Sequence, residues 1–150
     1  MTTLFSRESL PGLLGKTLGP GEWVEVTQER IDEFASASGD RQWIHVDVER
    51  ARTGPFGTTI AHGLLTLSMI ADLNQGMFKF DGFKMGLNYG YEKVRFPSTV
   101  PVGSRLRVMA KVLSFEPVGQ MFQTIIEYTV EREGADKPAC VAQMIFRHVP

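Results

Sequence analysis

The longest apolar stretch of this 150-residue chain is GLLTLSMIADLN, which runs from Gly63 to Asn74. Its apolar residues surround a helix instead of forming one stripe, which predicts a helix that is buried on nearly all sides. A bilayer span needs about 20 apolar residues, so a helix of this length is expected in a protein core. We therefore expect the rest of the fold to pack around it.

Four strand-like segments follow the apolar helix and are separated by turn residues. Residues 105–112 alternate almost strictly between polar and apolar side chains, and residues 124–130 do so in part. This length and alternation indicate an antiparallel sheet with one face on the core. The expected strands cover residues 83–95, 105–117, 121–132 and 139–149.

Before the apolar helix, the sequence predicts short elements joined by Gly- and Pro-containing loops. Residues 1–21 form a lead-in, and the alternating residues 22–26 predict a strand. A helix is expected to begin at Thr27 and to end at Gly39, with its apolar residues on one face. Residues 47–52 predict one or two further helical turns.

The composition fits one ordinary domain, residues 1–150, with 43% apolar and 22% charged residues. A formal net charge of −1 gives no electrostatic reason to expect nucleic acid or an anionic membrane as a partner. The single cysteine, Cys140, excludes an intrachain disulfide and favours a reducing compartment. No segment has the pattern of a signal peptide or a membrane span, so the sequence predicts a soluble, cytoplasmic protein.

The order of the elements predicts an α+β fold, because a strand, a helix, a loop and the buried helix precede four strands. One buried helix against a curved antiparallel sheet is the arrangement called the hot-dog fold. A single helix leaves the edges of a long sheet exposed, and edge pairing in a symmetric dimer is the usual remedy. We therefore expect a homodimer.

A carboxylate and an imidazole lie five residues apart after Gly39, at Asp40 and His45. Histidine titrates near neutral pH, and a carboxylate can orient a water molecule or take its proton. An Asp after a Gly is also common in turns and helix caps, so the pair alone admits a structural interpretation. A second block, from Phe56 to Gly63, leads into the buried helix and favours an acid/base pair.

The residues from Gly39 to His45, GDRQWIH, with Ala51 downstream, resemble the signature of the MaoC-like, (R)-specific enoyl-CoA hydratases. In that family the pattern is Gly-Asp-x-Asn-Pro-apolar-His, followed by a small residue after a spacer of five. The block from Phe56 to Gly63 and the C-terminal strands are also similar to the family. The resemblance covers about residues 10–149.

The resemblance implies a reaction and a role for each matching residue. Asp40 and His45 would hold and activate the water that adds to the trans-2 double bond of an acyl thioester. The backbone N–H of Gly63 would bind the thioester carbonyl. Gln42 stands where the family has Asn and would support this network, while Trp43 replaces a Pro and changes the geometry of the loop. The product would be an (R)-3-hydroxyacyl thioester, and the reverse reaction a dehydration.

The substrate implied by the resemblance is a thioester of coenzyme A or of acyl carrier protein in fatty-acid metabolism. Coenzyme A is part of this substrate, and no further cofactor and no metal are expected. Two other functions stay open: a hot-dog acyl-CoA thioesterase in which Asp40 activates water, and a non-catalytic subunit that binds acyl thioesters. The presence of His45 at this spacing argues against the first, and the presence of both residues argues against the second.

Other side chains that could carry chemistry have a structural interpretation. His62 is expected to cap or pack at the start of the buried helix, and Asp72 to lie on the helix surface or in an internal pair. Cys140 is expected in the core, and His148 has no assigned role. Four basic residues are expected on a solvated strand face, with the phosphates of coenzyme A as the alternative partner: Lys93, Arg95, Arg105 and Arg107.

Overall fold

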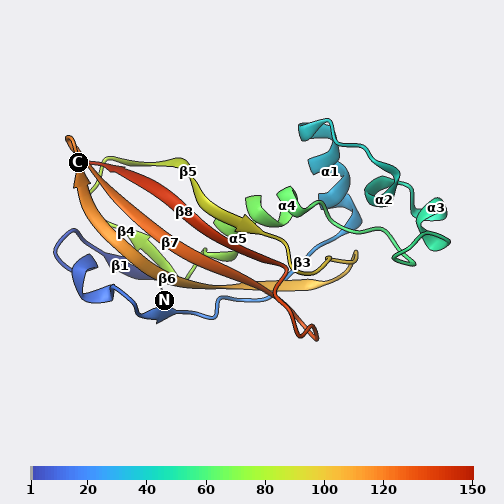
Figure 1. Cartoon of the computed structure of the whole chain (residues 1–150), viewed down its shortest axis with the longest axis horizontal. Helices are drawn as coiled ribbons and strands as arrows, with labels where there is room; N and C mark the ends of the chain where they lie inside the picture. The colour runs from blue at the N-terminus through green and yellow to red at the C-terminus, as the bar shows by residue number, and fades with distance from the viewer. Residues whose placement is uncertain (1) are drawn as a thin grey trace.

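A curved sheet and five short α-helices form most of the computed structural model, which describes residues 2–150 (Figure 1). Met1 of the expected lead-in lies outside the described residues. The strands are β1 (Thr3–Phe5), β2 (Thr17–Leu18), β3 (Val24–Glu25), β4 (Phe78–Phe80), β5 (Met85–Arg95), β6 (Arg105–Val118), β7 (Met121–Arg132) and β8 (Cys140–Val149). The helices are α1 (Gln28–Ser38), α2 (Trp43–Val46), α3 (Val48–Arg52), α4 (Gly63–Ser68) and α5 (Ile70–Leu73), with a 3-10 helix, η1 (Leu10–Leu13).

The main sheet has six strands in the order β2-β6-β7-β8-β5, and β3 pairs with β6 beside β2. All of these pairings are antiparallel. The four predicted C-terminal strands correspond to β5, β6, β7 and β8, so the α+β prediction is confirmed. The strand β5 lies at one edge of the sheet.

The sequence does not predict two short elements, β1 and β4, which pair in parallel as a separate two-stranded sheet. The rings of Phe5 and Phe78 face each other across this pair, with centroids 5.4 Å apart. Contacts between residues so distant in the chain leave no periodic pattern in the sequence.

The strand expected at residues 22–26 is shorter than expected, because only Val24 and Glu25 pair with β6.

Both ends of α1 form as the sequence predicts. The Thr27 side chain accepts a hydrogen bond of 3.1 Å from the backbone N–H of Arg30, which is the usual role of an N-terminal cap. At the other end Gly39 has a φ of 82°, and its N–H donates to the carbonyl of Ala35. This left-handed conformation favours glycine and turns the chain sharply into Asp40.

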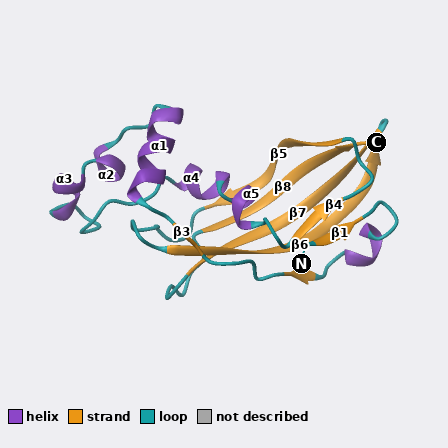
Figure 2. Ribbon diagram, turned by 180° about the vertical axis from the view of Figure 1, so that it is seen from behind, coloured by secondary structure: helices purple, strands orange, loops and turns teal. Residues whose placement is uncertain are grey.

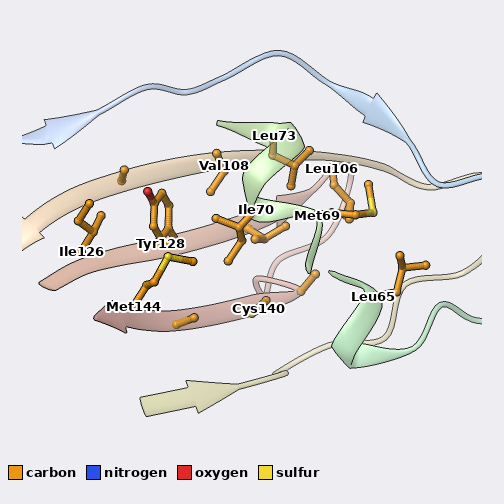
Figure 3. Packing of buried hydrophobic residues seen from close by; sticks show 14 of the residues in the cluster. Leu65, Met69, Ile70, Leu73, Leu106, Val108, Ile126, Tyr128, Cys140 and Met144 are labelled. Carbon is orange, nitrogen blue, oxygen red and sulfur yellow. The ribbon is translucent and has the colours of Figure 1, made fainter. Parts of the chain in front are cut away.

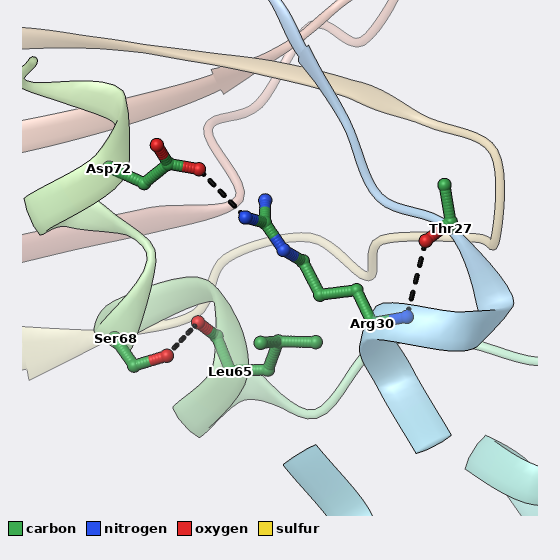
Figure 4. Close-up of polar contacts among 5 residues, drawn as sticks. All are labelled: Thr27, Arg30, Leu65, Ser68 and Asp72. Carbon is green, nitrogen blue, oxygen red and sulfur yellow. Dashed lines mark hydrogen bonds and ion pairs between the residues drawn. The ribbon is translucent and has the colours of Figure 1, made fainter. Parts of the chain in front are cut away.

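The predicted central helix is interrupted, and this corrects the expectation of one helix from Gly63 to Asn74. Met69 separates α4 from α5, although its backbone torsion angles remain near the helical region. The Ser68 hydroxyl donates to the carbonyl of Leu65 at 2.7 Å, an alternative hydrogen bond of the kind that perturbs helices (Figure 4). The two helices still run along the inner side of the sheet (Figure 2).

The core forms where α4 and α5 pack on the inner face of the sheet. Leu65, Met69, Ile70 and Leu73 are each at most 4% exposed, and the last three lie beside side chains of β6, β7 and β8 (Figure 3). Burial of this kind stabilises by about 1.5–3 kcal/mol per large apolar side chain. The expectation of a helix buried against an antiparallel sheet is therefore confirmed.

Cys140 is fully buried in this core, as the sequence predicts. Burial raises the pKa of its thiol to about 11, because a thiolate is poorly solvated there.

In the part of the chain that the structure describes, no helix is long and apolar enough to cross a membrane.

His148 lies in an aromatic cluster near the end of β8. It is 1% exposed, its Nε2 lies 2.9 Å from the Thr124 hydroxyl, and its ring contacts those of Phe80, Phe83 and Phe146. Burial lowers the pKa of this imidazole to about 4, because the charged form loses its hydration. His148 is therefore neutral near pH 7 in the folded protein.

We expect the stability of the protein to fall as the pH is lowered from about 6.5 to about 4, because unfolded His148 binds a proton with a pKa of about 6.5. Folded His148 binds its proton only near pH 4, so the unfolded state takes up more protons in this window. The loss should reach about 3 kcal/mol. Denaturant unfolding at pH 7, 6, 5 and 4 measures it. The variant His148→Gln should show a flatter dependence, and an unchanged slope would contradict the assignment.

Candidate active site

The helices α1, α2 and α3 lie beyond one end of the sheet, with α1 nearest to α4 and α3 farthest from it (Figures 1 and 2). Asp40 follows Gly39, the residue that ends α1, and is exposed. The backbone N–H of Gln42 donates to Asp40 Oδ1 at 3.3 Å, and the Ser38 hydroxyl accepts from the Asp40 N–H at 3.2 Å. These short-range bonds hold the loop while a carboxylate oxygen stays open to a ligand.

The imidazole of His45 is held in one tautomer by a backbone carbonyl. His45 belongs to α2, is 6% exposed, and its Nδ1 lies 2.7 Å from the carbonyl oxygen of Ile60. A carbonyl oxygen can only accept, so Nδ1 carries the proton in the neutral ring. The lone pair is therefore on Nε2, where it can take a proton from water.

Gln28 fixes the backbone around His45 from α1. Its Nε2 donates to the carbonyl of His45 at 2.8 Å, and its Oε1 accepts from the Thr59 hydroxyl at 2.5 Å. Thr59 is 1% exposed and precedes Ile60, which holds the imidazole. One amide thus connects α1, α2 and the loop that leads into α4.

His62 joins the same group, which the sequence does not predict. Its ring stacks on that of His45 with centroids 3.8 Å apart, and its Nε2–H donates to the backbone carbonyl of Asp40 at 2.9 Å. Its side chain makes no capping bond to α4, so of the two structural expectations packing is the one observed. Among residues 2–150 its buried Nδ1 has no hydrogen-bond partner.

Asp40, His45 and His62 are also the residues that could hold a metal ion, since one donor atom from each lies within 4.8 Å of the others. However, His45 Nδ1 and His62 Nε2 already bond to backbone carbonyls, and the two rings are stacked. Stacked rings hold their remaining lone pairs in two nearly parallel planes, which does not favour convergence of both on one ion. The geometry favours an acid/base group over a metal centre, and the absence of a metal requirement stays a prediction.

Gly63 is the first residue of α4 and lines a cavity of about 270 Å³ together with His45. The first N–H groups of a helix have no acceptor within the helix. A β-carbon on Gly63 would lie 3.0 Å from the ring of Phe96, which lines the same cavity. A side chain at this position would have to displace the Phe96 ring, whereas glycine leaves the space beside its N–H open.

The structure brings together three of the four predicted site residues through their side chains or N–H groups. Asp40 and His45 lie beside each other, and Gly63 shares a cavity with His45. Gln42 reaches Asp40 through its backbone N–H, while a role for its side chain stays a prediction. Sequence reasoning missed Gln28 and Phe96, for which the local sequence carries no signal.

A second, larger cavity of about 720 Å³ lies between the helices and the inner face of the sheet. Leu64, Leu67 and Ala71 line it from α4 and α5, on the helix face that follows Gly63. Tyr91 and Phe146 line it from β5 and β8. Its size and apolar lining suit a small-molecule ligand with a large apolar part.

Three charged residues that the sequence left with alternatives have protein partners. Asp72 accepts a hydrogen bond of 2.8 Å from Arg30, so it forms an ion pair between α5 and α1 (Figure 4). Arg107 pairs with Glu131 at 2.8 Å, and Arg105 pairs with Glu133. These pairings favour the solvated strand face over phosphate contacts for the two arginines.

The family model of the MaoC like domain matches residues 10–134 of this chain. The chain belongs to the MaoC-like family. The chain is also similar to 3-hydroxyacyl-thioester dehydratase Z from Mycobacterium tuberculosis. The two sequences are 49% identical over 150 residues, and the match covers 99% of each chain. Nodulation protein N from Rhizobium leguminosarum bv. viciae is 46% identical over 143 residues, or 93% of this chain and 89% of its own.

The solved structure of an R-hydratase from Pseudomonas aeruginosa, PhaJ1, has a TM-score of 0.69 at 23% identity and covers 91% of this chain and 81% of its own. At this identity the likeness concerns the fold, and the predicted hot-dog fold is confirmed. The predicted enzyme class, a hydro-lyase of the hydratase and dehydratase type, is confirmed by the family and by the full-length match.

Proposed function

We propose that this MaoC-like enzyme hydrates trans-2-enoyl thioesters to (R)-3-hydroxyacyl thioesters and catalyses the reverse dehydration. The observation that carries the proposal is the pairing of Asp40 with an imidazole whose free Nε2 is fixed by its bond to Ile60. The name of the full-length relative, a 3-hydroxyacyl-thioester dehydratase, supports the substrate class. The (R) configuration rests on the family resemblance.

In the proposed reaction, Asp40 orients a water molecule and His45 Nε2 takes one of its protons. The water oxygen attacks C3, and the electrons of the C2=C3 bond move toward the thioester, which places negative charge on the carbonyl oxygen. The N–H of Gly63 stabilises that charge. His45 then returns the proton to C2, so that water has added across the double bond and both residues are regenerated.

The cavity of about 720 Å³ supports an acyl substrate, because the helix face that lines it begins next to Gly63. Leu64 and Ala71 are seven residues apart on this face, or about 10 Å at 1.5 Å per residue. A bound acyl chain would lie along this face. Coenzyme A and acyl carrier protein both remain possible carriers in this proposal, and a cytoplasmic location stays a prediction.

The test is the absorbance of crotonyl-CoA near the enoyl-thioester band in the presence of the purified protein. We expect the band to fall without release of free thiol, and chiral analysis to give the (R)-3-hydroxy product. Release of thiol at the same rate would instead identify a thioesterase. No change in either quantity would identify a non-catalytic binding subunit, and an (S) product would contradict the stereochemical assignment.

We also propose that the enzyme is a homodimer, formed through the edge strand β5. Met85, Leu87 and Tyr89 on this strand are 47–64% exposed, which is unusual for large apolar side chains in a sheet. Pairing with a second copy would cover them and satisfy the free edge. Sedimentation equilibrium measures the mass, and a monomer at micromolar concentration would contradict the proposal.

Removal of metal ions should leave the hydration rate unchanged. The proposed reaction uses only Asp40, His45 and backbone N–H groups, and no step requires a Lewis acid. Activity is measured after dialysis against a chelator and again after addition of Zn²⁺ or Mg²⁺. A loss on dialysis that is reversed by one metal would show that the three-residue group holds an ion.

A further inference from the structure

Thr66 is a polar residue on an otherwise buried apolar face of α4. It is 1% exposed, and its Oγ1 has no hydrogen-bond partner within the described residues. Helical Ser and Thr hydroxyls commonly donate back to a carbonyl of the preceding turn, as Ser68 does to Leu65 at 2.7 Å. A buried hydroxyl without a partner is unfavourable, so Thr66 calls for a partner that residues 2–150 do not supply.

The position of Thr66 identifies where that partner binds. Thr66 lines the cavity of about 270 Å³ that also contains His45 and Gly63. Side chains on a helix lean toward its N-terminal end, over the residues three and four positions earlier. For Thr66 these residues are Gly63 and His62, so its side chain lies over the first turn of α4, and both Thr66 and Gly63 line the same cavity.

We propose that the Thr66 hydroxyl donates a hydrogen bond to the thioester carbonyl oxygen of the substrate, beside the N–H of Gly63. This inference rests on the proposed hydratase function. When water adds to C3, negative charge develops on the carbonyl oxygen, and two converging donors stabilise that charge better than one. Thr66 keeps its proton and forms no covalent bond. It is thus a further catalytic residue of the same site.

The test uses Thr66→Val, which keeps the shape of the side chain and removes only the hydroxyl. Because that hydroxyl has no partner among the residues that the structure describes, the melting temperature should stay the same or rise. The kcat for crotonyl-CoA hydration should fall about 10²-fold, and Thr66→Ser should restore most of it. A Thr66→Val enzyme with kcat within about threefold of wild type, well below the expected loss, would overturn the proposal. A loss of kcat that only matches the loss of folded protein would also overturn the proposal.

Thr124 provides the matched control, since it is a buried threonine with a protein partner outside this site. It is 0% exposed, and its hydroxyl lies 2.9 Å from His148 Nε2. Thr124→Val should lower the melting temperature, because it leaves a buried imidazole nitrogen without its partner. Its kcat per folded molecule should stay near that of wild type. Opposite effects of the two variants on stability and on kcat are the result that supports the proposal.

A spectroscopic measurement separates a bond to the carbonyl from a bond to the attacking water. Butyryl-CoA has no double bond to hydrate, and the carbonyl band of its ¹³C-labelled thioester can be followed by difference infrared spectroscopy. Binding to wild type should lower the carbonyl frequency, and Thr66→Val should move it back toward the free value. An unchanged frequency in Thr66→Val would overturn the proposal. A shifted frequency in a protein that hydrates no enoyl thioester would refute the proposed reaction and uphold the Thr66 contact.

Discussion

Replacing either Asp40 or His45 by Asn is expected to lower kcat for enoyl-thioester hydration by about 10²–10⁴-fold. Asp40→Asn removes the charge and a proton acceptor but keeps an oxygen that can accept from the Gln42 N–H. His45→Asn keeps an N–H near the position of Nδ1 that can donate to the Ile60 carbonyl, and it removes Nε2. Both variants should therefore fold, so that the loss of rate reports the loss of proton transfer.

Asp47 offers a matched control for Asp40, because it is a second aspartate in the same segment. Its carboxylate accepts from the Arg50 N–H at 3.1 Å and caps α3. Asp47→Asn should change stability by about 1 kcal/mol or less and leave kcat near wild type.

The Asp40→Asn/His45→Asn double variant should lose little beyond the worse single variant, since the effects of residues that act as a unit are not additive. More than about a tenth of wild-type kcat in a folded single variant would remove that residue from the site.

The parts of the fold that follow from local chemistry could be predicted from the sequence. The alternating residues of β6 place Leu106 and Val108 on the core, and the caps Thr27 and Gly39 set the ends of α1. The interruption at Met69 could not be predicted, because the apolar pattern continues through it and the Ser68–Leu65 hydrogen bond beside it is seen only in the folded helix. The pairing of β1 with β4 joins residues more than 70 positions apart and leaves no local signal.

The candidate site divides in the same way. Asp40, His45 and Gly63 could be found because their spacing matches a family pattern, and the structure places them around one region. Gln28 could not be found, since its role comes from a contact with the backbone of His45, 17 residues away. The only sequence signal at Thr66 is a hydroxyl within an apolar helix. Its importance becomes visible only in the structure, where Oγ1 has no hydrogen-bond partner among the described residues.

Gly63→Val is expected to lower kcat by about 10²–10³-fold, the cost of losing one donor to the developing oxyanion. The Gly63 backbone does not require a positive φ, so strain of the main chain does not explain its need for glycine. The side chain that Val adds would instead fill space beside the N–H, where a β-carbon already lies 3.0 Å from the Phe96 ring. Substrate and side chain cannot both occupy that space, while Asp40 and His45 remain in place.

Displacement of Phe96 is the competing explanation for such a loss, and a second variant tests it. Phe96 is 42% exposed, so its ring can move, and Phe96→Ala opens space for a side chain at position 63. If Gly63→Val acts by blocking the N–H, the Gly63→Val/Phe96→Ala double variant should stay about 10²-fold or more below Phe96→Ala alone. If it acts by pushing Phe96, the double variant should match Phe96→Ala. The melting temperature and kcat are measured on the same preparations, and a folded Gly63→Val enzyme with near-normal kcat would exclude the oxyanion role.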